Sequence, residues 1–130
     1  MIVAPTGDGA NPFIDTADIA AVAVALLAGA APLAEYDLSG PEALSFGEVA
    51  HILTPYAGRE VKHVDLPASD WSVGAIQNGL PADYAAMLAM LFTLIREGLD
   101  AEVSSGVRAA LGRPATSVQD WAAREAGSLA

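Results

Sequence analysis

The 130-residue sequence contains no cysteine, which excludes disulfide bonds, thiolate zinc sites and cysteine nucleophiles. Lysine and arginine together number only six, against 16 acidic residues, so the formal net charge is −10. Because phosphate binding needs clustered basic side chains, this charge balance predicts no nucleic-acid partner. The acidic excess is typical of a feature that maintains solubility.

Long apolar runs are also missing. The longest cover residues 19–28 and 84–95, and both are shorter than the ~20 residues that a membrane-spanning helix needs. The amino terminus has no basic region followed by an apolar core, so no secretory signal is visible. These absences predict a cytoplasmic protein without membrane association.

Apolar residues, by contrast, are abundant, at 53% of the chain. A chain of this length fits one domain, which we place at residues 1–130. The excess of apolar residues suits either a well-filled core or an apolar surface that binds something else.

The spacing of apolar and turn residues predicts short strands first and helices afterwards. Strands are expected near residues 1–12, 13–15, 35–38 and 61–66, and helices over residues 16–27, 45–56, 69–77, 81–98, 104–111 and 117–126. Short strands that alternate with helices predict an α/β fold, with a sheet portion in residues 1–67 and a helical portion in residues 68–130. The strands are too few for a complete sheet, so we expect them to join another one.

Several helix starts have recognisable caps. Ser45 and Glu48 form the pattern of a capping box. Thr16 and Asp18 are both candidates for the N-cap of the helix over residues 16–27, and Asp15 is expected to accept backbone hydrogen bonds in the preceding turn. As a cap, Asp18 would serve stability and not chemistry, and asparagine could replace it at little cost. The competing interpretation, an acid/base pair of Asp15 and Asp18, is less favoured.

The N-cap of the helix over residues 69–77 is not decided by the sequence, because either Ser69 or Asp70 could cap it. Pro81 suits the first turn of the helix that follows.

Residues 7–9 superficially resemble a glycine-rich nucleotide loop. A dinucleotide fingerprint needs a third glycine where this chain has Pro12, and a helix where it has a predicted strand. Gly7 and Gly9 therefore predict a tight turn, and no residue of this chain is assigned to cofactor binding.

The tyrosines and histidines lack the sequence patterns of catalytic or metal-binding residues. None of Tyr36, Tyr56 and Tyr84 is followed four residues later by the lysine that would activate a phenol as a proton donor. His51 and His63 have no metal-ligand spacing, and no Gly-x-Ser-x-Gly motif accompanies them. We expect both histidines to lie on the solvated surface, and we assign no catalytic or metal-binding residue.

The best candidate for a binding surface lies between residues 71 and 95. An apolar stripe recurs there at helical spacing, and the helix is apolar nearly all round, which indicates burial on two sides. Core packing explains such a stripe, and so does a substrate pocket. The candidate substrate-binding residues are Trp71, Tyr84, Met87, Leu88, Leu91 and Phe92.

Three motifs carry a family resemblance. They are residues 12–20 (Pro-Phe-Ile-Asp-Thr-Ala-Asp-Ile-Ala), residues 38–50 (Leu-Ser-Gly-Pro-Glu-Ala-Leu-Ser-Phe-Gly-Glu-Val-Ala) and residues 111–117 (Leu-Gly-Arg-Pro-x-Thr-Ser). The chain resembles the C-terminal, substrate-binding part of NmrA-like atypical short-chain dehydrogenase/reductases. The resemblance implies a partial Rossmann-type sheet with a C-terminal helical cap, and residues 71–92 as a lid over the substrate. It implies NAD(P)H as the cofactor of the complete family fold, with quinone or carbonyl substrates.

The glycine-rich loop, first strands and proton donor of that family are absent from this sequence. We therefore expect a truncated or split reductase part that neither binds NAD(P)H nor catalyses alone. The alternative is a free-standing module that binds a small apolar ligand or self-associates without redox activity. Unpaired strand edges and apolar surface predict a partner in either case, a second copy or a Rossmann-bearing protein.

Overall fold

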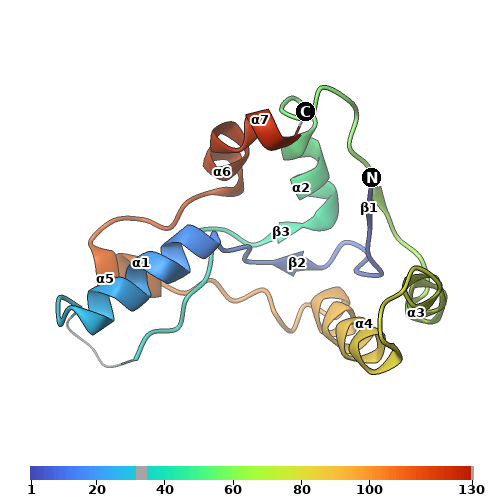
Figure 1. Ribbon diagram of the computed structural model, residues 1–130, viewed down its shortest axis with the longest axis horizontal. Helices are drawn as coiled ribbons and strands as arrows, with labels where there is room; N and C mark the ends of the chain where they lie inside the picture. Colours follow the sequence, from blue (N-terminus) through green and yellow to red (C-terminus); the bar gives the residue numbers. More distant parts are fainter. Residues whose placement is uncertain (32–34, 130) are drawn as a thin grey trace.

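The structure is a computed structural model that describes residues 1–31 and 35–129. Within these residues short strands come first and helices predominate afterwards (Figure 1). The elements are β1 (Ile2–Val3), β2 (Ala10–Asn11), α1 (Thr16–Leu27), β3 (Leu44–Ser45), α2 (Phe46–Leu53), β4 (His63–Val64), α3 (Ala68–Gln77), α4 (Ala82–Arg96), α5 (Gly106–Leu111), α6 (Val118–Arg124) and α7 (Ala126–Leu129). The predicted α/β class with few, short strands is confirmed.

The strands form two separate pairs. β1 runs parallel to β4, with Ile2 opposite His63, and β2 runs antiparallel to β3, with Ala10 opposite Ser45. Each strand has two residues. The partners are far apart in sequence, so these pairings fix the chain's long-range path although they contribute few hydrogen bonds.

Two of the predicted strands are wrong. Residues 13–15 and 35–38 are irregular, and the strands that form nearby are β2 and β3. A strand exists only where a second backbone lies at ladder distance, and local alternation does not supply that partner. Isolated bonds are made in and beside these segments instead: the Ser104 hydroxyl donates to the Asp37 carbonyl at 2.6 Å, and just outside them the Gly40 N–H donates to the Pro12 carbonyl at 3.1 Å.

The helix starts confirm part of the sequence analysis. The capping box is present, since the Ser45 hydroxyl accepts from the Glu48 N–H at 3.2 Å and the Glu48 carboxylate accepts from the Ser45 N–H at 2.8 Å. The predicted caps Ser69 and Asp70 of α3 are wrong. The extended backbone of Pro67 lets α3 begin at residue 68, with no side chain capping it.

Among the described helices, α3 packs with α4, α1 with α5, α2 with α6, and α6 also with α7. Figure 1 shows these pairs around the strands, with α1 and α5 at one end of the molecule and α3 and α4 at the other. The buried apolar side chains are mostly small, as at Val22, Ala85 and Ala122. Much apolar surface therefore stays open, and Leu27 is 90% exposed. The division at residue 67 stays a prediction.

Candidate functional site

The predicted substrate-binding residues lie on α3 and α4. Trp71 and Phe92 are half-buried and meet edge to face, with ring centroids 5.0 Å apart. Tyr84, Met87 and Leu91 are 41–48% exposed. Leu88 is the remaining member of the predicted set, and it is half-buried. The structure thus joins two of the six predicted residues in a ring contact and leaves three exposed on α4. The role of all six in substrate binding stays a prediction.

A row of aromatic rings continues from these two residues into the centre of the molecule. Phe92 lies 6.2 Å from Phe46 and Phe46 lies 5.1 Å from Phe13, both edge to face. Such geometry is favourable for aromatic quadrupoles and is worth about 0.5–1.5 kcal/mol per pair. The row connects the hairpin of α3 and α4 to the start of α2 and to the segment that leads into α1.

The predicted placement of His63 on the solvated surface is wrong. Its ring is half-buried, lies 5.8 Å from the ring of Phe46, and has Nε2 2.8 Å from the carbonyl oxygen of Ala4. The parallel pairing of β1 and β4 draws this side chain inward, an effect that strand alternation alone does not reveal. His51 is exposed, as predicted.

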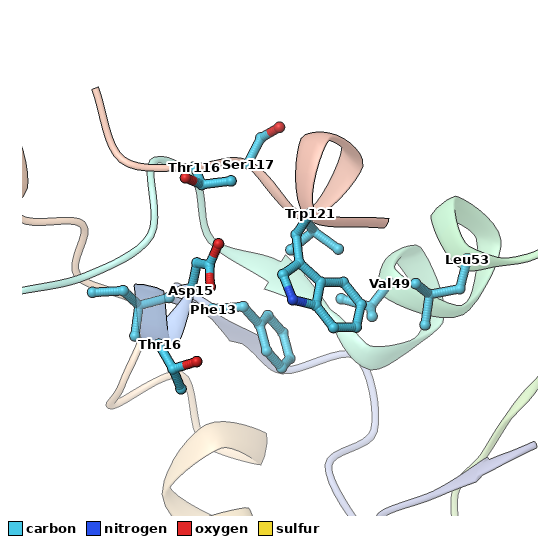
Figure 2. Close-up of a pocket in the computed structure, with 10 residues that line it drawn as sticks. Phe13, Asp15, Thr16, Val49, Leu53, Thr116, Ser117 and Trp121 are labelled. Atoms are coloured by element: carbon cyan, nitrogen blue, oxygen red, sulfur yellow. The ribbon is translucent and has the colours of Figure 1, made fainter. Parts of the chain in front are cut away.

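A cleft of about 370 Å³ lies where three segments meet, and Figure 2 shows its lining. One wall is the segment that enters α1, the second is α2, and the third is the start of α6 with the residues before it. The lining residues are Phe13, Ile14, Asp15, Thr16, Val49, Leu53, Thr116, Ser117, Val118 and Trp121. Sequence reasoning missed this site. The signals that could have pointed to it were the apolar stripe of α2 and the lone tryptophan of the last predicted helix.

Asp15 is the buried charged residue of the cleft. It is the N-cap of α1, and its Oδ1 accepts the Ala17 N–H at 2.9 Å. Arg124 Nη2 lies 2.8 Å from Oδ2 as an ion-pair partner. Both carboxylate oxygens of Asp15 thus have a partner, the Ala17 N–H at Oδ1 and the Arg124 guanidinium at Oδ2. The prediction that Thr16 or Asp18 caps α1 is therefore wrong.

Asp18 has a different role from the one its sequence position indicates. The side chain is 1% exposed, and its carboxylate receives Arg113 Nη2 at 2.7 Å and the Thr116 N–H at 2.6 Å. Burial opposes ionisation, but the hydrogen bonds from Thr116 and Arg113 outweigh it and hold the pKa of Asp18 below its usual value. Asp18 thus joins the first turn of α1 to the segment before α6.

A second charged contact lies on the turn of residues 7–9. Arg96 pairs with Asp65, and its Nε donates to the Pro5 carbonyl at 3.0 Å. The Asp65 carboxylate also accepts the Gly7 N–H at 3.0 Å. The bond from Arg96 and then the one from Gly7 lower the pKa of Asp65. Because these groups are bonded to one another, the cluster stabilises the turn of residues 7–9.

Two further features bear on chemistry. Across residues 1–31 and 35–129, no three His, Asp or Glu side chains gather as metal ligands would. Over the same residues, no helix is long and apolar enough to cross a membrane.

No family model matches the chain. It is 38% identical over 126 residues to the uncharacterized oxidoreductase YesF of Bacillus subtilis, which covers 96% of this chain and 44% of YesF. It is 39% identical over 127 residues to festuclavine dehydrogenase easG of Aspergillus fumigatus, covering 95% of this chain and 44% of that enzyme. The crystal structure of the NADPH-dependent quinone oxidoreductase QOR2 from Escherichia coli, complexed with NADPH, matches with a TM-score of 0.82 and 26% identity.

That match covers 95% of this chain and 44% of QOR2. The chain thus spans less than half the length of each of these proteins. In each of these three cases the similarity covers nearly all of this chain, and the matched protein is named as an oxidoreductase or a dehydrogenase. The chain therefore belongs to the NmrA-like family of NAD(P)-binding reductases and corresponds to the C-terminal part of its members.

Proposed function

We propose that this chain is the substrate-binding part of an NAD(P)H-dependent oxidoreductase that acts on apolar quinone or carbonyl compounds. The observation that carries the proposal is the 38–39% identity to oxidoreductases over 95–96% of the chain. The similarity to the NADPH-dependent quinone oxidoreductase supports the substrate class.

The hairpin of α3 and α4 is the proposed substrate surface. Trp71 and Phe92 offer aromatic surface, and Tyr84, Met87 and Leu91 leave adjoining apolar surface open to solvent. Flat apolar substrates gain affinity mainly by covering such surface. The Trp71 indole N–H already donates to the Val3 carbonyl at 3.1 Å, which fixes the ring against β1.

NAD(P)H is proposed to bind through a separate NAD(P)-binding part. In this family the pyrophosphate is expected at a helix N-terminus that follows a glycine-rich turn. The turn at Gly7 and Gly9 leads into β2 instead, and a Cβ at Gly7 would meet the Arg96 side chain at 3.0 Å. This turn is therefore already filled by the protein itself.

The test uses the two tryptophans, Trp71 and Trp121, which are the only ones in the chain. In a Trp121→Phe variant, the fluorescence of Trp71 should be quenched saturably by 2-methyl-1,4-naphthoquinone. A Leu88→Ala change beside Phe92 should weaken that binding several-fold, whereas Asp100→Ala, at an exposed position, serves as the matched control. Absence of saturable quenching at Trp71 would contradict the proposed substrate surface.

A parallel titration of the same chain with NADPH should show no saturable binding. A micromolar dissociation constant from calorimetry would refute the proposal that the cofactor needs a separate part.

We also propose that the chain associates with a second copy or with an NAD(P)-binding partner. On α4 five apolar side chains are 38–58% exposed: Tyr84, Met87, Met90, Leu91 and Leu94. Apolar surface of this kind commonly marks an interaction site. Sedimentation at micromolar concentration should show a dimer, and Leu91→Asp should dissociate it while Asp83→Asn on the same helix should not. A wild-type monomer under these conditions would exclude self-association.

A further inference from the structure

We infer that Asn78, in the turn between α3 and α4, is a site of spontaneous deamidation that the folded chain keeps closed and that reacts only when the end of α3 unwinds. The reaction replaces a neutral amide with a carboxylate in the middle of the hairpin that α3 and α4 form (Figure 1). This site is inferred from the geometry of the turn and does not depend on the proposed reductase activity.

The sequence supplies the reacting groups. The chain has two asparagines, Asn11 and Asn78. Deamidation begins when the backbone nitrogen of the next residue attacks the side-chain carbonyl carbon of the asparagine. Pro12 follows Asn11 and has no N–H to lose, so this path is closed there. Gly79 follows Asn78 and has no side chain to obstruct the attack, so this pair is the reactive one.

The reaction consumes only water. The Gly79 nitrogen loses its proton and forms a bond to Cγ of Asn78, and the bond from Cγ to Nδ2 breaks. Ammonia leaves with the proton that the backbone nitrogen gave up, and a cyclic succinimide remains. Water then opens the ring at either carbonyl carbon, which yields aspartate or isoaspartate.

The folded turn keeps the two reacting groups apart. Asn78 is the C-cap of α3, with φ −87° and ψ 12°. At this ψ the Gly79 nitrogen nearly eclipses the backbone nitrogen of Asn78 and is rotated away from Cβ, which carries the side-chain amide. Ring closure needs the Gly79 nitrogen and Cβ on the same side of the bond between Cα and the carbonyl carbon. The attack therefore requires a large rotation about that bond.

Backbone hydrogen bonds oppose the rotation. The Gly79 N–H donates to the Ile76 carbonyl at 2.9 Å, and the Leu80 N–H donates to the Ala75 carbonyl at 3.0 Å. Together with the positive φ of Gly79, 94°, these bonds form the Schellman motif that ends many helices. Rotation at Asn78 breaks both bonds, and the proton that the reaction removes is the one donated to Ile76.

The side chain of Asn78 is held as well. Its Nδ2 donates to the Gly74 carbonyl at 2.7 Å, which directs the amide back along α3. Asn78 is nevertheless exposed to solvent, and hydrogen bonds at the ends of helices open at a lower free energy than those of the core. The site is closed by local hydrogen bonds and not by burial, so the opening of one helical turn is enough to start the reaction.

The products cannot rebuild the turn. In aspartate an oxygen replaces the Nδ2 that donates to Gly74, so two acceptors face each other. The new negative charge lies at the carboxyl end of α3, where the helix dipole disfavours it. Isoaspartate lengthens the backbone of the turn and displaces the bonds to Ile76 and Ala75. The reaction thus leaves a permanently weakened connection in the hairpin that holds Trp71 against Phe92.

The experiment compares deamidation in the folded and the unfolded chain. The whole chain is incubated at mildly alkaline pH with and without urea, and mass spectrometry of the tryptic peptide of residues 63–96 follows the conversion of amide to acid. A synthetic peptide of residues 74–82, incubated under both conditions, corrects for any direct effect of urea. We expect the folded chain to react at least about tenfold more slowly, which corresponds to about 1.4 kcal/mol for opening the turn.

Two variants change the closure and keep the reacting pair. Gly74→Ala places a better helix former in the last turn of α3 and should slow the reaction of the folded chain about two- to fivefold. Ala75→Gly should accelerate it by a similar factor. Both variants should react as the parent does in urea. Asn78→Ser, which has no amide, is the control and should remove the conversion from this peptide.

Equal corrected rates in the folded and the unfolded chain would overturn the inference, as would the absence of conversion in urea. Unchanged rates in folded Gly74→Ala and Ala75→Gly would also overturn it, because the end of α3 would then not control the reaction. Asn78→Asp reproduces one product and should unfold at a lower urea concentration than the parent. An equal or higher midpoint would contradict the stated effect on the turn.

Discussion

Replacement of Asp18 tests the buried ion pair that joins the carboxyl-terminal segment to α1. Alanine removes the acceptor of two charge-assisted hydrogen bonds, from Arg113 at 2.7 Å and from the Thr116 N–H at 2.6 Å. A bond to a charged group contributes about 1.5–3 kcal/mol. The guanidinium of Arg113 is 48% exposed and regains water when released, so its share is about 1 kcal/mol at most. The expected loss of unfolding free energy is about 2–4 kcal/mol.

Asparagine at the same position separates this account from helix capping. A capping Asp18 would tolerate asparagine at almost no cost. In the observed contact, asparagine keeps one acceptor for Thr116 and turns the other into a donor facing Arg113. Asp18→Asn should therefore lose about 1–2 kcal/mol.

The assay is urea unfolding followed by circular dichroism at neutral pH. Asp100→Asn, an exposed carboxylate, is the control and should change stability by no more than about 0.5 kcal/mol. Asp18→Asn and Arg113→Ala should be non-additive in a double-mutant cycle. A wild-type midpoint for Asp18→Asn, or strict additivity, would refute the ion-pair account.

The pH dependence has a defined sign. The pKa of Asp18 is lower in the folded protein than the ordinary value of 3.8. Its contribution is therefore fully present above that value and is lost as the pH falls through the lower folded pKa. The parent should lose more stability than Asp18→Asn on acidification below about pH 4. Parallel stability curves for the two proteins would contradict this assignment.

Two further predictions concern backbone contacts and capping. A Cβ at Gly40 would lie 1.7 Å from the Phe13 carbonyl oxygen, so Gly40→Ala should destabilise by about 2–4 kcal/mol or prevent folding. Gly74 lies within α3, and a Cβ there would meet no atom within 4 Å. Gly74→Ala should therefore stabilise the protein by about 0.5–1 kcal/mol in thermal unfolding. If Gly40→Ala proved more stable than Gly74→Ala, the placement of Gly40 would be refuted. Ser45→Ala should lower the free energy of unfolding by about 0.5–2 kcal/mol in urea unfolding. Adding Glu48→Ala to this variant should lower it little further, and full additivity of the two changes would contradict the capping box.

The parts of the fold that follow from neighbouring residues were predictable. The capping box of Ser45 and Glu48 and the cap at Ser117 depend on groups three residues apart, and both are present. Gly29 and Gly79 adopt positive φ values of 68° and 94° just after α1 and α3 end, a conformation that favours glycine. Such features are visible in sequence because the atoms that stabilise them belong to one turn of chain.

The parts that depend on distant partners were not predictable in the same way. Asp15 and Asp18 occupy one turn and both carry a carboxylate, so local rules cannot decide which one caps α1. The choice is made by Arg113 and Thr116, which lie 95 and 98 residues further along the chain from Asp18. The cleft is similar, because Phe13, Val49 and Trp121 meet only when three segments pack together.

The sequence by itself determined the α/β class, the approximate extent of most helices, the family, and the exclusion of cysteine chemistry. These follow from composition, from helical spacing and from motifs that are each contiguous in the chain. Only the tertiary structure decided which strands pair, which aspartate is buried against an arginine, and where a cleft opens. Those outcomes are set by contacts between residues far apart in sequence, whose free energy depends on burial and geometry that exist only in the folded chain.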